Sequence, residues 1–187
     1  QGFTSTAGIR WNYDSLDKSQ VPTRGMIARS SLNYYLHAPG ADGGFAQAES
    51  RLTAFRPWNE RNVLIGFGGG GTSFSSTSAP LQQFTLGGPF RLGGYGFEQF
   101  RGSNYLHAGG GILHNPEIIP TFLGGKTYVG AWYEAGSMFE RLGDANYRQS
   151  ISGGAIFETP VGPVFIGGSV NENGRGRFYF SFGRVFK

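Results

Sequence analysis

Cysteine is absent from this chain of 187 residues, so neither a disulfide framework nor a thiolate metal site is available. Charge is also scarce: Asp, Glu, Lys and Arg make up 15% of the residues, against roughly 25% in an average globular protein. The net charge of +4 comes from dispersed Lys and Arg without a basic run, which argues against a nucleic-acid partner. This composition does not favour an ordinary soluble domain.

Long apolar runs are missing as well. No stretch approaches the roughly 18 consecutive apolar residues that a transmembrane helix requires. If the chain crosses a membrane, we therefore expect a barrel, in which the strands satisfy one another's backbone groups. The sequence opens at Gln1 without a basic and apolar signal segment, so we expect any export signal to be removed or to lie outside this sequence.

Glycine and aromatic residues are abundant instead, at 33 residues and 16% of the chain. Glycine with Tyr, Phe and Trp suits closely packed strands and aromatic girdles, while scattered Arg, Asn, Gln and Ser suit a wet lumen. Disorder does not fit so many aromatic residues. Composition thus favours a strand-built membrane protein.

Period-two alternation of apolar and polar residues recurs along the chain and predicts about nine strands. They are expected at residues 3–13, 25–37, 45–55, 62–72, 105–114, 127–139, 150–158, 162–170 and 176–186. Strands of this length match a tilted bilayer crossing, whereas soluble strands are usually nearer five or six residues. We therefore predict an all-β fold, an antiparallel transmembrane β-barrel of about eight or nine strands, over a soluble sandwich or small soluble barrel.

Two strand faces are predicted to contact lipid. In the last strand, one face is aromatic and ends one residue before the C-terminus, as expected of a closing strand: Phe178, Phe180, Phe182 and Phe186. In the fourth strand, the apolar face carries Val63, Ile65 and Phe67. Its opposite face is a nearly side-chain-free stripe of Gly66, Gly68 and Gly70, which would let another segment approach closely.

A long segment rich in Ser, Gly and Pro, about residues 73–103, interrupts the strand pattern. Connections of this length are usually functional or disordered. Its length and the nearby glycine stripe predict that it folds into the barrel interior. The expected organisation is one transmembrane β-barrel domain over residues 1–187 that carries this segment as a lumen-inserted loop.

Residues with catalytic or metal-binding potential are few. His37, His107 and His114 have no spacing typical of a metal site. Residues 71–75, GTSFS, lack the final Gly of the Gly-any-Ser-any-Gly nucleophile elbow. The loop glycines lack the Lys-Ser/Thr pair of a phosphate loop. We expect no catalytic residue, no metal and no cofactor, so this chain alone is not predicted to be an enzyme.

Four motifs, in order, carry a family resemblance. They are YDSLD with PTRG at 13–17 and 22–25, FTLGGPFRLGGY at 84–95, WYEAG at 132–136, and FETPVGP with GRFYFSFG at 157–163 and 176–183. Together they resemble the BamA-type bacterial surface antigen superfamily, including its lumen-inserted loop, its aromatic-acid strand motif and its closing strand. The loop tip LGGY and the following FRGSNY are similar to the patatin-like type V secretion proteins, which couple a lipase passenger to a barrel.

The resemblance implies an outer-membrane β-barrel of a Gram-negative bacterium that anchors, assembles or translocates a protein passenger, with any lipase domain fused upstream. Its expected partners are outer-membrane lipid or detergent and the barrel-assembly machinery. Family barrels have sixteen strands, so closure is expected from missing N-terminal strands or from a second copy in a homo-oligomer. An outer-membrane lipid-modifying enzyme barrel and a soluble ligand-binding barrel remain alternatives.

The resemblance also suggests how the loop is held. In the family, an Arg at the loop tip meets an acid on a lumen-facing strand. Here Glu134 stands at the acid position, and the tip, with Gly94 and Tyr95, has its Arg displaced to Arg91. We therefore predict that Arg91 contacts Glu134, with Arg101 as the next candidate. From the residues alone, Glu134 fits either a loop holder or a hydrated lumen acid.

Overall fold

The computed structural model describes residues 3–41, 43–74, 82–117 and 125–183. One antiparallel sheet contains nine strands: β1 Ser5–Asp14, β2 Gly25–His37, β3 Phe45–Pro57, β4 Asn62–Ser73, β7 Asn104–His114, β8 Thr127–Phe139, β9 Arg148–Phe157, β10 Val164–Asn171 and β11 Gly176–Phe182. The nine strands expected from the alternation are confirmed. The bounds of the first eight strands lie within two residues of the expected ones; the last strand ends at Phe182, and Phe186 lies outside the described residues.

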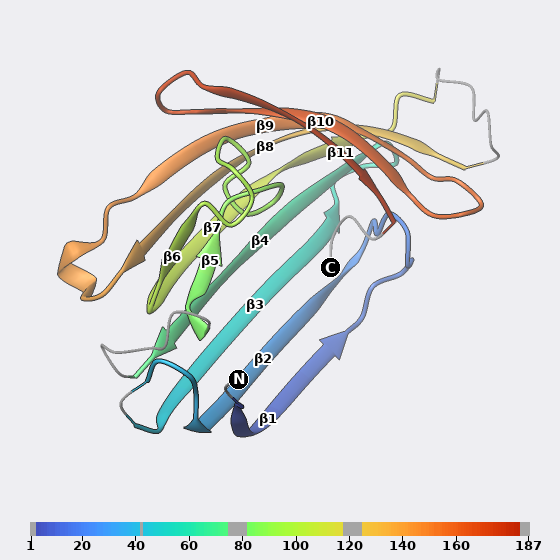
Figure 1. Ribbon diagram of the computed structural model, residues 1–187. Coiled ribbons are helices and arrows are strands. Elements are labelled where there is room, and N and C mark those ends of the chain that lie inside the picture. The colour runs from blue at the N-terminus through green and yellow to red at the C-terminus, as the bar shows by residue number, and fades with distance from the viewer. Residues whose placement is uncertain (1–2, 42, 75–81, 118–124, 184–187) are drawn as a thin grey trace.

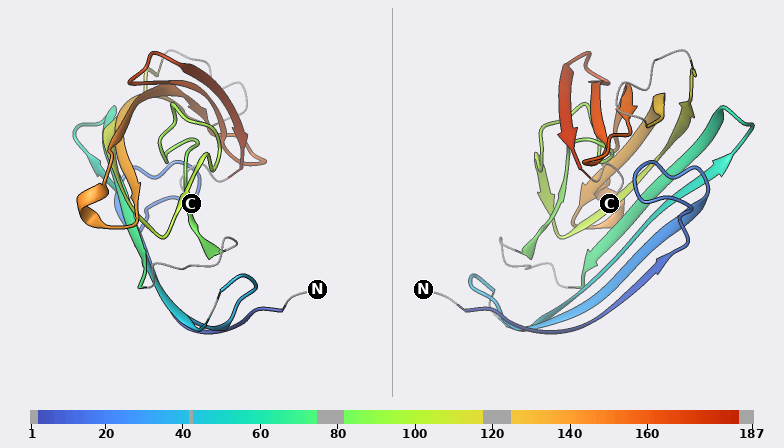
Figure 2. Two further views of the ribbon diagram at one scale, coloured as in Figure 1. Left: turned by 60° about the vertical axis from the view of Figure 1, so that its left-hand side comes forward. Right: turned by 90° about the vertical axis from the view of Figure 1, so that its right-hand side faces the viewer.

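The strands follow one another around a curved trough (Figures 1 and 2). β4 pairs directly with β7, because the intervening loop leaves the sheet and folds into its concave side. Within that loop, β5 Phe84–Leu86 and β6 Phe100–Gly102 form a separate short hairpin. β1 and β11 are the two edges of the sheet. The fold is thus all-β and antiparallel, with the curvature of part of a barrel.

Helical structure is limited in the described residues to short turns such as η2 Leu142–Asp144, a 3₁₀ segment between β8 and β9. No helix in that part of the chain is long and apolar enough to cross a membrane.

Alternation gives the sheet two chemically different faces. Large apolar side chains project from the convex face, where Ile9 is 75% exposed and Phe178 is 75% exposed. Their neighbours along each strand point into the trough. Since no other part of the described chain covers these outer residues, the convex face has the apolar surface that a lipid-facing wall requires.

The packed core lies on the concave side and corrects part of the lipid-facing prediction. Val63 and Ile65 are 5% and 3% exposed and pack with Leu113 and Trp132 in one apolar cluster. Phe67 lies against the loop residue Phe90. The prediction that this face of β4 contacts lipid was wrong, because alternation identifies residues that share a face but not which face the loop covers.

The glycine stripe of β4 also faces the other way. Gly66 has nothing within 4 Å of an added Cβ, and a Cβ at Gly68 or Gly70 would meet the convex-face side chains of Ala108 and Leu106. The loop therefore packs on the opposite face of β4. The glycine stripe therefore does not provide the close approach of the loop that was expected from the sequence.

The turn between β1 and β2 spans the end of the trough. The Gln20 Nε2 atom donates a hydrogen bond to the Thr159 carbonyl, 3.2 Å away in the β9–β10 turn. Val21 is fully buried and joins the main core cluster. This turn links two parts of the sheet that are far apart in sequence and helps to fix the curvature of the trough.

Candidate functional site: the loop anchor

The described part of the loop, residues 82–103, lies on the concave face of the sheet (Figure 1). Its tip is closed by short backbone hydrogen bonds, from Gly87 N to Arg91 O at 2.8 Å and from Tyr95 N to Leu92 O at 3.0 Å. Phe90 and Leu92 have φ angles of 58° and 72°. Non-glycine residues in this left-handed region cost on the order of 1 kcal/mol each, so the contacts around the tip must hold it in place.

Glu134, in the middle of β8, provides the central contact. Its side chain is fully buried beneath the loop tip. One carboxylate oxygen accepts the Leu92 N–H at 3.2 Å, and the other accepts the Gly93 N–H at 2.8 Å. The second oxygen also accepts hydroxyl hydrogen bonds from Ser150 at 3.2 Å and Ser152 at 3.0 Å. Four donors thus compensate a carboxylate that would otherwise be costly to bury.

The register of the sheet produces this arrangement. Glu134 is paired with Ser150 across β8 and β9, and Ser152 lies two residues further along the same face. Ser169, on β10, is the partner of Ser152, and their hydroxyls are hydrogen-bonded at 2.7 Å. Polar side chains from three neighbouring strands therefore converge under the loop. The reading of Glu134 as a loop holder agrees with this geometry, whereas a hydrated lumen acid does not.

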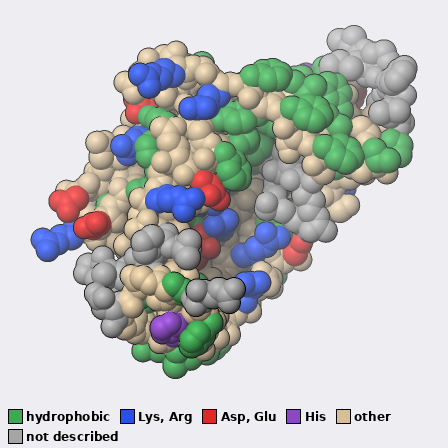
Figure 3. All heavy atoms as spheres, in the orientation of Figure 1, with side chains coloured by type: hydrophobic (Ala, Val, Ile, Leu, Met, Phe, Trp, Pro, Cys, Tyr) green, Lys and Arg blue, Asp and Glu red, His purple; other side chains and the backbone are tan. Residues whose placement is uncertain are grey.

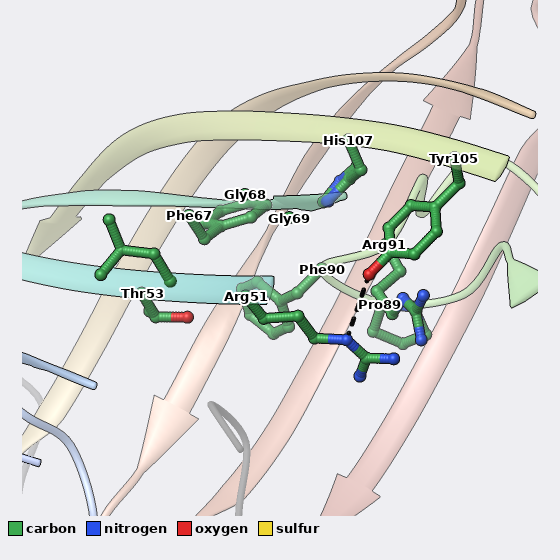
Figure 4. Close-up of a pocket in the computed structure, with 11 residues that line it drawn as sticks. Arg51, Thr53, Phe67, Gly68, Gly69, Pro89, Phe90, Arg91, Tyr105 and His107 are labelled. Carbon is green, nitrogen blue, oxygen red and sulfur yellow. Dashed lines mark hydrogen bonds between the residues drawn. The ribbon is translucent and has the colours of Figure 1, made fainter. Parts of the chain in front are cut away.

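Arg91 does not reach Glu134, so that predicted contact was wrong. The Arg91 guanidinium donates to the Thr85 carbonyl at 2.6 Å and lies 5.6 Å from the centre of the Tyr105 ring. No ion pair joins it to Glu134 among the described residues. The left-handed turn at the tip directs two backbone N–H groups toward Glu134, while the Arg91 side chain points toward Tyr105 (Figure 4).

Arg101, the second candidate, is also elsewhere. It forms an exposed ion pair with Glu98, 3.2 Å away within the loop. His107, on β7, is instead the basic side chain near the anchor. Its Nε2 atom lies 3.7 Å from a Glu134 oxygen and has no hydrogen-bond partner. The carboxylate is therefore anchored mainly to backbone N–H and serine hydroxyl groups rather than to an arginine.

Gly94 and Tyr95 lie over the last two strands. The Gly94 carbonyl accepts a hydrogen bond from Asn171 Nδ2 at 3.2 Å. The Tyr179 hydroxyl, on β11, donates to the carbonyls of Gly93 and Tyr95, the latter at 2.8 Å. The tip is thus fixed to β10 and β11 as well as to β8.

The two tip glycines are required by close approach. A Cβ at Gly93 would lie 2.3 Å from the Ser169 hydroxyl oxygen, and one at Gly94 would lie 2.6 Å from the Asn171 backbone nitrogen. Both distances are shorter than real Cβ contacts allow. Glycine therefore lets the loop backbone rest directly on the strands.

The tip also has a contact at the rim of the trough. The Tyr95 hydroxyl is hydrogen-bonded to the Glu172 carboxylate in the β10–β11 turn. Burial raises the pKa of the Tyr95 phenol, and the bond to Glu172 raises it further, to about 12. Tyr95 consequently remains a neutral hydrogen-bond donor at physiological pH.

An aromatic stack completes the anchor. Phe90 stacks on Trp132, with ring centres 4.5 Å apart and planes 15° from parallel. The centre of the Phe90 ring also lies 5.6 Å from the centre of the Phe165 ring and 5.9 Å from that of the Phe67 ring. Aromatic pairs of this kind contribute about 0.5–1.5 kcal/mol beyond area burial. Apolar packing at Phe90 and polar contacts at residues 92–95 thus hold the same few residues of the loop.

The closing-strand residues are placed as expected on the outer face. Phe178, Phe180 and Phe182 are 75%, 68% and 57% exposed. Tyr179, between the first two, points inward to the loop. The inward position of Tyr179 follows from strict alternation once Phe178 and Phe180 are placed on the outer face. The contacts of Ser150, Ser152 and Asn171 with the loop site, in contrast, could be found only from the strand register.

No group of three or more His, Cys, Asp or Glu side chains able to hold a metal ion occurs among the described residues. His37 is in β2, where its ring stacks on Phe3 at 4.7 Å. His114 bonds Asn62 on the neighbouring strand at 2.9 Å. The contacts of Glu134 and Tyr179 are what hold the loop against the curved sheet.

One family model matches almost the entire chain. The Omp85 superfamily domain matches residues 1–186. This family comprises outer-membrane barrels that insert or secrete proteins, in Gram-negative bacteria or in organelles, and its members work with assembly machinery or oligomerise. A curved antiparallel sheet with a loop fastened to its concave face agrees with that match. The chain therefore belongs to the Omp85 superfamily.

Proposed function

We propose that this chain is the barrel domain of a Gram-negative outer-membrane protein that anchors and translocates a protein passenger, in the manner of type V secretion. The observation that supports it best is the position of the loop. Glu134 and Tyr179 fasten it to β8 and β11. The inner face of β1–β3 is left with a hollow whose lining residues are mostly polar or charged. This arrangement provides a path for a polypeptide between the fixed loop and the inner face of β1–β3.

Barrel closure is part of the same proposal. In lipid, each unpaired backbone group at the edges of β1 and β11 would cost several kcal/mol. We propose that strands outside this chain, or a second copy of it, pair with these edges, and that the barrel-assembly machinery inserts the closed barrel. In a closed barrel the concave face of this sheet becomes the lumen, and the convex face meets lipid.

We further propose that the chain is not itself an enzyme. In this proposal the passenger is a patatin-like lipase domain in another part of the full-length protein. Supporting this, His37, His107 and His114 contact an aromatic ring, a carboxylate and an amide, respectively, and none is hydrogen-bonded to a serine hydroxyl among the described residues. The lipid-modifying alternative would need such a set.

The test is passenger exposure at the cell surface, measured by protease accessibility for the full-length protein. Glu134→Ala should reduce exposure, because the loop loses its central contact. Glu140→Ala is the matched control, since this exposed carboxylate has no side-chain partner among the described residues. Heat-modifiable migration on gels establishes that each barrel is folded. A folded Glu134→Ala barrel that exposes the passenger at the wild-type rate would contradict a role of the loop in translocation.

A further inference from the structure

Four arginines line two hollows on the concave face, three of them from strands β1, β2 and β3 and the fourth, Arg91, from the loop. Two adjoining hollows, of about 390 Å³ and about 150 Å³, share Arg51 and Thr53. The larger also contains Arg10 and Arg29, and the smaller contains Arg91. We call these four residues and the two hollows the arginine groove. Figure 3 shows Lys and Arg side chains gathered in the hollow of this face beside the loop.

Positive charge in the arginine groove is poorly compensated. Glu49 is the one acidic residue lining either hollow, and it is already paired with Arg51 at 2.6 Å. Neither Arg10 nor Arg29 has a side-chain hydrogen bond or ion pair to another described residue. Arg91 uses one nitrogen on the Thr85 carbonyl. Because a guanidinium carries five N–H donors, most of the donors in the groove remain available.

The strand register makes this arrangement unfavourable for the fold alone. Arg29 on β2 is directly opposite Arg51 on β3, on the same face of the sheet. Like charges in this position are destabilising. Arg91 adds a further cation beside Arg51, and Figure 4 shows the two guanidiniums near the same Tyr105 ring. An anionic occupant would relieve this repulsion.

The spacing of the cations fits an extended chain. Arg10, Arg29 and Arg51 lie on three adjacent strands, with Arg29 opposite Arg51 and Arg10 opposite Ser31, two residues from Arg29. Direct and diagonal neighbours in antiparallel sheets are roughly 5–8 Å apart. Side chains on one face of an extended polypeptide repeat about every 6.5 Å. A carboxylate at every second residue would therefore meet successive arginines.

The location of the groove favours a polypeptide over a lipid headgroup. The same strands carry Ile9, Trp11 and Leu32 on the convex face, where lipid would lie. The arginines are on the concave face of the same strands. They are spread over neighbouring strands rather than converging on one point, as a single headgroup would require. We propose that the arginine groove binds an acidic, extended polypeptide segment, resting on the proposed passenger-translocating function and naming the chemistry of the segment that it favours.

The test is binding of a fluorescent peptide with aspartate at every second position to the full-length protein in detergent, followed by anisotropy. We expect binding that weakens with salt, because exposed charges are screened. The double variant Arg10→Gln with Arg29→Gln should weaken it at least about tenfold, the loss of roughly 1.4 kcal/mol. Arg56→Gln, an exposed arginine that lines neither hollow, is the matched control and should leave binding unchanged.

A charge-reversed variant, Arg10→Glu with Arg29→Glu, should instead bind the same peptide with lysine in place of aspartate. Arg29→Gln should keep or raise the unfolding midpoint, which a purely structural arginine would not do. Absence of peptide binding would overturn the proposal that the arginine groove binds an acidic segment. The proposal would also be overturned if inorganic phosphate displaced the peptide while the arginine variants bound it as tightly as the wild type. Passenger exposure at the cell surface is measured separately in the wild type. If the passenger is exposed but the peptide does not bind, only the proposal for the arginine groove is refuted. If the peptide binds but the passenger is not exposed, the proposed function is refuted.

Discussion

Glu134 on β8 accepts the backbone N–H of Gly93 at 2.8 Å, across a separation of 41 residues in sequence. Because the donor belongs to the backbone, the contact does not depend on the side chain at that loop position. It depends on the loop backbone turning its N–H groups toward the sheet. The arginine-to-acid contact that the resemblance suggested is thus not formed here, and the carboxylate contacts the loop backbone instead.

Replacing Glu134 with alanine should lower the free energy of unfolding by about 3 kcal/mol. It leaves two N–H groups and two hydroxyls without their acceptor in a buried site. Urea unfolding in liposomes, followed by tryptophan fluorescence, measures the loss. Glu140→Ala should lie within about 0.5 kcal/mol of wild type, and an equal loss in both variants would exclude a specific anchor.

Gly93→Ala should displace the loop, because the new Cβ would lie 2.3 Å from the Ser169 hydroxyl oxygen. We expect a destabilisation of about 1–3 kcal/mol, the usual cost of overpacking. Ser169→Gly in the same chain should recover part of it. Gly66→Ala, with nothing within 4 Å of the added atom, is the control. Additive effects of Gly93→Ala and Ser169→Gly in a double-mutant cycle would argue against this contact.

Neighbouring residues of β11 should respond differently to substitution. Phe180→Arg places a charge on the convex face and should reduce folding into liposomes by about 2–4 kcal/mol near the midplane. Tyr179→Phe should leave insertion intact but make the loop more accessible to protease, because two hydrogen bonds to loop carbonyls are lost. If Phe180→Arg inserted as well as wild type, the assignment of the convex face to lipid would be wrong.

Asp17, in the β1–β2 turn, should make stability depend on acid pH. Burial raises the pKa of its carboxyl, but hydrogen bonds from the Thr23 hydroxyl and from the Arg24 and Thr23 N–H groups outweigh this and lower it below 3.8. A depressed pKa contributes stability above the unfolded value and loses it as pH falls through the folded value. The difference in unfolding midpoint between wild type and Asp17→Asn should therefore shrink as pH falls below about 3.8. A difference independent of pH would refute this linkage.

Much of the architecture follows from local sequence. Alternation along each strand predicts the strands because successive side chains of an extended chain point to opposite faces. The same rule pairs Phe178 with Phe180 on one face and leaves Tyr179 on the other. Glu134, which the resemblance puts at the acid position, accepts hydrogen bonds from the loop backbone. These features depend on residues close together in the chain.

Other features were decided by the tertiary structure. Alternation could not say that Val63 and Ile65 face inward, because that depends on which side of the sheet the loop packs against. Nor could it say that Arg91 points toward Tyr105 while Leu92 and Gly93 turn their N–H groups to Glu134. These outcomes depend on strand register and on a left-handed turn at the loop tip, which only long-range contacts can hold.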